Sequence, residues 1–334
     1  MKKSLLVSVI PAVAACALAA PALAATQVGA SENWAGYVVS PNDGSGFTAV
    51  SGQWKQPRVA CKANVQPTYS AYWVGLGGGA QQSNALEQVG TQADCTTGGR
   101  ATYYAWYELV PSAPVKLALA IHAGDSVWAR TAVNGDHVTL TLVNRTTGQR
   151  WQRTLTMTST APDTSTAEWV AEAPSACAGS AASYCTPLPL ANFGMATFTD
   201  AHATSAGHTG SISDSHWSAQ RIALQPSSGS QFGGGPGGYL AGGGYSSFSG
   251  YQPSQGAAPT SLSKGGSGFK VKYGAALSTQ SSSPGSAQGY YGYTYGGGYY
   301  SGGYGYSGGY GYAYGGDGDY GYYGGGYYGY YGGY

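Results

Sequence analysis

Glutamate and glutamine residues on predicted strands are the side chains in this sequence that are best placed to do chemistry. Only 9% of the 334 residues are charged, so an acidic residue inside a predicted strand is unusual and indicates a specific role. Carboxyl groups can transfer protons, and an amide can donate a hydrogen bond to a developing negative charge. Strand alternation turns neighbouring residues to opposite faces and puts residues two or four apart on one face. The residues concerned are Glu87, Gln88, Glu108, Glu168 and Glu172.

Motifs of several other catalytic classes are missing from the sequence. It contains no G-x-S-x-G elbow, no H-E-x-x-H and no P-loop. His202, His208 and His216 lie near two aspartates, Asp200 and Asp214, which leaves a metal site open as an alternative. Loop histidines are more often solvated than metal-bound, and we therefore expect no metal here.

The elements that would position these residues are predicted to be strands. From Asn33 to about residue 225, short runs of aromatic, β-branched and alternating residues are separated by turn signals, and no amphipathic helix is evident after the N-terminal segment. Such a pattern predicts an all-β sandwich or barrel. A last alternating run, Gly268–Tyr273, predicts one more strand, so we expect the domain to close near Gly274. The clearest earlier strands are Tyr69–Gly75, Thr102–Val110, His137–Val143 and Glu168–Glu172.

The N-terminus has the features of a secretory signal. Two lysines precede an apolar run, and a small-residue cleavage pattern ends at Ala24, which predicts a signal peptide over residues 1–24. A lipoprotein signal at Cys16 is an alternative. Removal of residues 1–24 leaves 13 basic and 14 acidic side chains. This balance provides no excess of basic side chains for binding nucleic acid. No later stretch is long and apolar enough for a transmembrane segment. We expect a secreted, extracellular protein.

Four cysteines remain after the predicted cleavage, and an even count in an exported chain predicts two disulfides. Four cysteines allow three pairings. Cys177 and Cys185 are close in sequence and are expected to pair with each other, which leaves Cys61 with Cys95.

Two segments have a composition that cannot build a core. Residues 227–257 are rich in Gly and Ser and predict a flexible insertion in a domain that spans residues 25–274. Residues 275–334 predict a disordered tail; of the 46 residues from 289 on, 21 are Gly and 19 are Tyr. A tail without chemistry is one reading. The other is a tail that binds the cell surface or aromatic-rich partners through its tyrosines.

Seven segments, in order, resemble the glutamic peptidases of family G1, the eqolisins. The resemblance covers residues 30 to 225 and resumes at the predicted last strand. No single segment is specific; their order and spacing are what identify the family. The segments are Ser31–Tyr37 (SENWAGY), Tyr72–Gly77 (YWVGLG), Leu86–Gly90 (LEQVG), Tyr104–Glu108 (YAWYE), Ala123–Asp125 (AGD), Leu142–Gln149 (LVNRTTGQ) and Ala167–Glu172 (AEWVAE).

The resemblance implies a fold and a set of site residues. The implied fold is a two-sheet antiparallel β-sandwich of the concanavalin or lectin-like kind, with Glu172 and Gln88 as the catalytic pair. Gly77, Leu109 and Val110 depart from the residues of fungal members, and we expect these departures to alter subsites rather than the chemistry. Residues implied to border the cleft or support the pair are Trp34, Gly36, Trp73, Trp106 and Glu108.

The implied activity is that of a pepstatin-insensitive acid endopeptidase that needs no cofactor and acts, as a monomer, on polypeptides. Glu172 would take a proton from water, Gln88 would stabilise the oxyanion, and the proton would return to the leaving amine. One alternative is a non-catalytic lectin-like sandwich that binds carbohydrate or peptide. Another is a glycosidase that uses Glu108 and Glu172 as its two carboxyl groups.

Overall fold

The chain folds into layers of strands in the computed structural model, which describes residues 27–79, 83, 85–177, 185–225 and 255–275. Every regular element in these residues is a β-strand, which confirms the all-β prediction. The described residues also contain no helix that is long and apolar enough to cross a membrane. The predicted signal peptide, most of the predicted insertion and nearly all of the predicted tail lie outside them.

The strands are short, as the turn-rich sequence predicts, and most are five to eleven residues long. They are β1 (Gln27–Ser31), β2 (Trp34–Pro41), β3 (Phe47–Lys55), β4 (Thr68–Gly77), β5 (Leu86–Cys95), β6 (Ala101–Val110), β7 (Val115–Lys116), β8 (Ser126–Asn134), β9 (His137–Asn144), β10 (Gln149–Thr156), β11 (Ala167–Glu172), β12 (Ser175–Cys177), β13 (Cys185–Pro187), β14 (Met195–Ser205), β15 (His208–Ser211), β16 (Trp217–Leu224), β17 (Ala257–Pro259) and β18 (Phe269–Tyr273).

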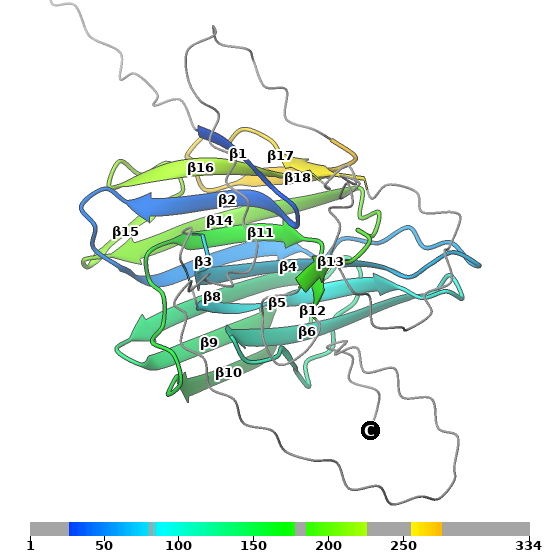
Figure 1. Cartoon of the computed structure of the whole chain (residues 1–334), viewed down its shortest axis with the longest axis horizontal. Coiled ribbons are helices and arrows are strands. Elements are labelled where there is room, and N and C mark those ends of the chain that lie inside the picture. The colour runs from blue at the N-terminus through cyan, green and yellow to red at the C-terminus, as the bar shows by residue number, and fades with distance from the viewer. Residues whose placement is uncertain (1–26, 80–82, 84, 178–184, 226–254, 276–334) are drawn as a thin grey trace, which may run out of the picture.

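The layers belong to one curled sheet of 16 strands, and β12 and β13 form a separate two-stranded sheet. Along the large sheet the order is β10-β9-β8-β3-β14-β18-β17-β16-β2-β11-β4-β5-β6-β7. β3 and β8 contact β4 across the interior, so the two halves of the sheet pack face to face as a sandwich does (Figure 1). The halves are joined through β16, β17 and β18 at the top of the view.

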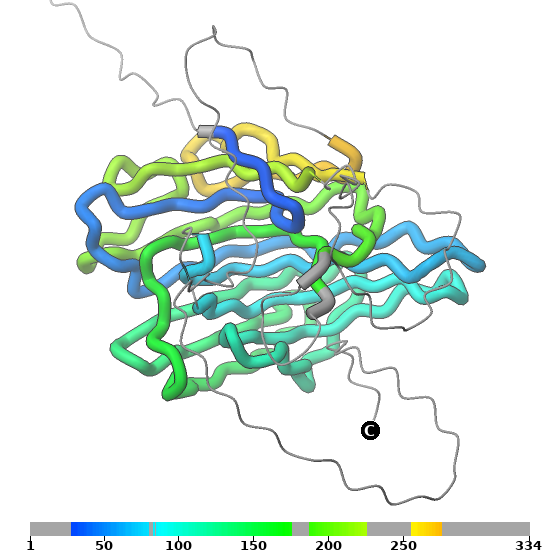
Figure 2. Tube along the Cα trace, in the orientation of Figure 1, coloured from blue at the N-terminus to red at the C-terminus, as the bar shows by residue number. Residues whose placement is uncertain are grey.

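Nearly all strand pairs are antiparallel; β1 lies parallel to β16. This pairing brings the start of the described chain beside its later segments, as the blue and yellow ends of the tube show in Figure 2. The predicted last strand is confirmed as β18. β17 begins at Ala257, at the end of the predicted insertion, and pairs with β16 and β18.

The interior between the two halves is built from the apolar side of each strand. In β9 the alternation read from the sequence is confirmed, since Val138, Leu140 and Leu142 are fully buried. β11 is buried along its whole length. Its Trp169 belongs to the interior core, whereas Val170 belongs to a smaller cluster on the opposite face. That smaller cluster marks the face on which the candidate site lies.

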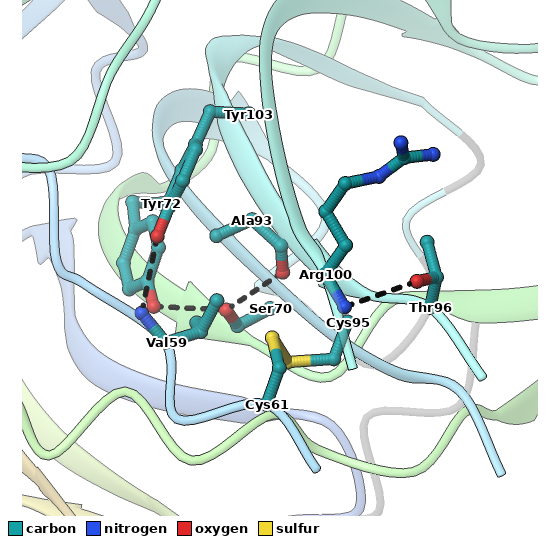
Figure 3. Close-up of a disulfide and its surroundings, with 9 residues drawn as sticks. All are labelled: Val59, Cys61, Ser70, Tyr72, Ala93, Cys95, Thr96, Arg100 and Tyr103. Atoms are coloured by element: carbon teal, nitrogen blue, oxygen red, sulfur yellow. Dashed lines mark hydrogen bonds between the residues drawn. A yellow bond between two sulfur atoms is a disulfide. The ribbon is translucent and has the colours of Figure 1, made fainter. Parts of the chain in front are cut away.

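A disulfide between Cys61 and Cys95 ties the segment after β3 to the end of β5, and it confirms one half of the predicted pairing. Figure 3 shows the hydrogen bonds around it, including the one from the Val59 backbone N–H to the Tyr103 hydroxyl. The backbones of Cys177 and Cys185 lie directly opposite each other in β12 and β13. The bond between these two cysteines stays a prediction.

Candidate active site

Five neighbouring strands, β2, β11, β4, β5 and β6, carry the candidate residues on one face. Gln88 on β5 lies directly opposite Glu108 on β6. Glu172 on β11 lies between Trp34 of β2 and Ala71 of β4. Because side chains alternate along a strand, these residues share the face that carries Val170 and lies away from the interior core. The sheet thus gathers residues that are up to 139 positions apart in sequence.

Glu172 is held by nitrogen donors. The Trp73 indole N–H donates to Glu172 Oε2 at 2.6 Å, and the Asn33 side-chain amide donates to Oε1 at 3.1 Å. Glu172 is only 5% exposed, and burial raises the pKa of its carboxyl group to about 7. The donors Trp73, Trp34 and Asn33 work in the opposite direction, because hydrogen bonds to a carboxylate favour its charged form.

Gln88 is oriented by Glu108. Its amide nitrogen donates to Glu108 Oε2 at 2.7 Å, and Gln88 itself is 1% exposed. Burial among protein atoms, and to a lesser degree the nearby Glu172 charge, raise the pKa of Glu108 to about 8. The hydrogen bond from Gln88 lowers it. The two carboxyl groups oppose each other's ionisation, and the Gln88 amide is fixed beside Glu108. Such a set of groups can take up or release a proton and can stabilise a developing negative charge.

Tryptophans form the surroundings of this site. Trp34 and Trp73 meet edge to face with ring centroids 5.0 Å apart, and Trp106 belongs to the same cluster. Gly36 does not line open space. A Cβ atom there would lie 2.0 Å from the Trp169 carbonyl oxygen, so Gly36 allows β2 to approach β11 closely.

The other two strand glutamates form a separate group. Glu168 lies four residues before Glu172 on β11, in the row that leads through Gly75 to Gln88, and Glu87 lies next to Gln88 on β5. Glu168 shares the face of Glu172, but its carboxylate lies close to Gly79. A Cβ atom at position 79 would lie 3.0 Å from an oxygen of the Glu168 carboxylate. Glu87 accepts a hydrogen bond from the Asp163 backbone N–H. Burial raises the pKa of Glu87 to about 8 and that of Glu168 well above its ordinary value. The structure therefore does not bring these two glutamates to Glu172.

The histidine cluster predicted near Asp214 forms in part. His208 Nε2 and His216 Nδ1 lie 2.9 and 2.7 Å from the two Asp214 oxygens. Burial opposes ionisation of Asp214, but hydrogen bonds from His216 and His208 outweigh it and lower its pKa to about 2. The two rings are stacked, with centroids 3.9 Å apart. The three side chains offer ligand atoms that lie within 4.8 Å of one another, so a metal ion at this cluster stays an open alternative.

Asn33 is the site residue that sequence reasoning did not single out. It lies in the segment SENWAGY, directly before β2, and its side chain is fixed by the Ser31 hydroxyl at 3.1 Å. The segment has no clear alternation of apolar and polar residues, which gave no reason to place Asn33 beside Glu172. The available signal in the sequence was an amide side chain one residue before Trp34 in a segment that resembles the family.

Comparisons with known proteins identify the family of the chain. The model of the Peptidase A4 family matches residues 32–230. The chain is 30% identical over 204 residues to Aspergillopepsin-2 of Aspergillus niger, which is 55% of this chain and 68% of that protein. A buried carboxyl and amide pair on a curled β-sheet thus occurs here in a chain of glutamic-peptidase type.

Solved structures give the same class. Scytalido-glutamic peptidase with a transition state analog inhibitor is 26% identical, with a TM-score of 0.55, and the match covers 72% of this chain and 98% of that one. SCP-B of the eqolisin family, in complex with the tripeptide Ala-Ile-His, shares the fold at 23% identity and a TM-score of 0.50, with the same coverage. The protein belongs to the Peptidase A4 family and is a glutamic-type acid endopeptidase with polypeptide substrates.

Proposed function

We propose that Glu172 and Gln88 are the catalytic pair with which this endopeptidase hydrolyses peptide bonds. The observation that carries the proposal is the fixation of both groups on one face. Trp73 and Asn33 hold the Glu172 carboxylate, and Glu108 holds the Gln88 amide. Fixed groups add little reorganisation cost at the moment of reaction, which is what preorganised catalysis requires.

The proposed reaction moves one proton out and back. The Glu172 carboxylate takes a proton from water, and the water oxygen forms a bond to the scissile carbonyl carbon. The carbonyl electron pair moves to the oxygen, which accepts a hydrogen bond from the Gln88 amide. The intermediate then collapses, the C–N bond breaks, and Glu172 returns its proton to the leaving amine. No metal or cofactor enters any step.

Glu108 is proposed as a positioning residue rather than a catalytic one. An amide nitrogen carries two N–H bonds, and the contact with Glu108 Oε2 uses one of them. This contact sets the plane of the Gln88 amide and therefore the direction of the second N–H. Because the pKa of Glu108 is raised to about 8, its carboxyl group is neutral in acid and places no second negative charge beside the oxyanion.

The proposal predicts how kcat and kcat/KM depend on pH. With a pKa of about 7 in the free site, Glu172 is largely protonated in acid. Each further donor to the carboxylate lowers this pKa, and the attacking water is such a donor. The acid limb of kcat, which reports the enzyme–substrate complex, is therefore expected at lower pH than the acid limb of kcat/KM. Limbs at the same pH, with activity undiminished in strong acid, would instead make protonated Glu172 the initial proton donor.

The direct test is hydrolysis of a denatured protein across the acidic and neutral range, with pepstatin and EDTA present. The wild type is expected to be active in acid and insensitive to both inhibitors, and Glu172→Gln and Gln88→Ala are expected to be inactive or nearly so. His137→Ala, an exposed change on the other half of the sheet, is the control. Full activity in Glu172→Gln would overturn the proposal. The match to the Peptidase A4 family argues against the lectin-like alternative, because this is a family of peptidases.

We further propose, from the sequence alone, that the protein is exported through its N-terminal segment and acts outside the cell as a monomer. The low-charge composition and the small-residue cleavage pattern at Ala24 support export. The tyrosine-rich residues 289–334 support retention at the cell surface or binding to aromatic-rich partners. Removal of residues 275–334 is expected to abolish surface retention and leave hydrolysis intact, which fractionation of cultures would measure.

A further inference from the structure

We infer that a hollow at the disulfide end of the active-site face is a subsite for a basic side chain of the substrate. The inference rests on the proposed function, since it assumes that the polypeptide lies across this face. The hollow has a volume of about 650 Å³, within the range of ligand pockets. Its wall includes Pro67, Tyr69, Asp94, Thr97, Thr102 and Leu188.

The hollow shares its face with the catalytic pair. Along β5, strand alternation puts Asp94 on the same side as Gln88, six residues away. Asp94 lies directly opposite Tyr69 of β4 and Thr102 of β6. Ala71, two residues from Tyr69, pairs with Glu172 on its other side. The hollow therefore begins one strand repeat beyond the row that contains Glu172.

The separation can be expressed in substrate residues. Six strand residues at about 3.3 Å each place Asp94 about 20 Å from Gln88. The distance to Glu172 is shorter, since it spans two strands and one repeat. An extended peptide has the same rise per residue as a strand. A side chain three to six residues from the scissile bond would thus reach the hollow.

The chemistry of the wall favours a cation with an apolar stem. Asp94 is 2% exposed, and Asp94 and Tyr69 are the two ionisable side chains in the wall. The Asp94 carboxylate accepts a hydrogen bond from the Gln92 amide at 2.8 Å. Burial raises the pKa of the neighbouring Tyr104, and the Asp94 charge and its hydrogen bond raise it further. The carboxylate therefore adds negative potential to this part of the cleft.

A lysine or arginine side chain matches this arrangement. Its methylene stem would lie along the Pro67, Tyr69 and Leu188 side of the wall, and its charged head would reach Asp94. A metal ion does not match, because one carboxylate among hydroxyl groups provides too few oxygen ligands of the kind that Ca²⁺ requires. The Cys61–Cys95 disulfide anchors the end of β5 next to Asp94, so the wall is held in place.

The test uses pairs of fluorogenic peptides that differ in one residue, lysine or its uncharged isostere norleucine. The residue is moved through every position up to six on each side of the scissile bond. At about pH 5, we expect lysine to raise kcat/KM about tenfold at one position three to six residues away. In Asp94→Asn this ratio is expected to fall to about one, with the norleucine peptide cleaved as before.

A second variant keeps the test decisive if Asp94→Asn folds poorly. Thr102 is exposed and directly opposite Asp94, so Thr102→Lys places a lysine of the protein itself at the hollow. It is expected to abolish the preference for lysine. Thr154→Lys, an exposed threonine on the other half of the sheet, is the matched control and is expected to retain it.

Two outcomes would overturn the inference. One is a lysine-to-norleucine ratio near one at every position in the wild type. The other is a ratio that persists in both Asp94→Asn and Thr102→Lys. Failure of the proposed catalytic pair looks different, because Glu172→Gln would then cleave both peptides of each pair at wild-type rates.

Discussion

Two pairs of buried glutamates, one on β11 and β6 and one on β11 and β5, have different surroundings, and the difference separates the proposed active site from its neighbours. Glu172 and Glu108, the active-site pair, contact the N–H donors of Trp73, Asn33 and Gln88. Glu168 and Glu87, the neighbouring pair, lie near Gly79 and Asp163. Burial raises the pKa in all four. Burial is therefore common to both pairs, and the active-site pair of the proposal differs in the side-chain N–H groups of Trp73, Asn33 and Gln88 beside it.

The largest expected effect compares Glu172 with Glu168, which share one strand and one face. Glu172→Gln removes the proposed base and is expected to lower kcat about 10⁴-fold. Glu168→Gln is expected to change kcat less than tenfold in acid, where Glu168 is neutral because its pKa is raised. Single-peptide kinetics in acid measure both. A loss in Glu168→Gln as large as that in Glu172→Gln would remove the distinction between the pairs.

Gln88 is expected to give the next largest effect. Gln88→Ala removes the proposed oxyanion donor and should lower kcat about 10²- to 10³-fold while KM changes little. Gln92 lies four residues along the same strand, and Gln92→Ala is the matched control for a substrate without basic residues. Equal losses in both variants would assign Gln88 a structural role.

The donors to Glu172 are expected to have a smaller, pH-dependent effect. Trp73→Phe removes the 2.6 Å hydrogen bond that favours the carboxylate, so the acid limb of kcat/KM should move to higher pH. Activity on the acid side is expected to fall about tenfold. Trp106→Phe, a change on the same face with no hydrogen bond to Glu172, should leave the limb in place. A limb that moves equally in both variants would point to general packing.

The smallest expected effect concerns stability, and here the neighbouring pair is the more sensitive reporter. A carboxyl group with a raised pKa in the folded state contributes stability below its unfolded pKa, near 4.5, and loses it as pH rises through the folded value. Unfolding free energy should therefore fall by about 1.4 kcal/mol per pH unit for Glu87 between about pH 4.5 and 8, and Glu168, whose pKa is also raised, adds to the decline in the same direction. Glu168→Gln should make this decline shallower by one group, as measured by denaturant unfolding across pH. An unchanged slope would contradict the buried state of Glu168.

Much of the fold followed from local patterns in the sequence. Alternation in His137–Asn144 predicted a half-buried strand, and Val138, Leu140 and Leu142 are indeed fully buried. The run Gly268–Tyr273 predicted β18, and four cysteines predicted the Cys61–Cys95 bond. β17 was not expected, because three residues after a long Gly- and Ser-rich segment have too little pattern to be recognised.

The sequence by itself determined the chemistry of the side chains, their alternation along each strand and the family to which seven ordered segments point. Only the tertiary structure decided which glutamates stand together, since a strand pattern says which face a residue takes but not which strand lies beside it. The pairing of β5 with β6 brings Gln88 to Glu108, and the position of β11 between β2 and β4 brings Glu172 to Trp73 and Asn33. Register between distant strands depends on the packing of the whole sheet, and that information is not local.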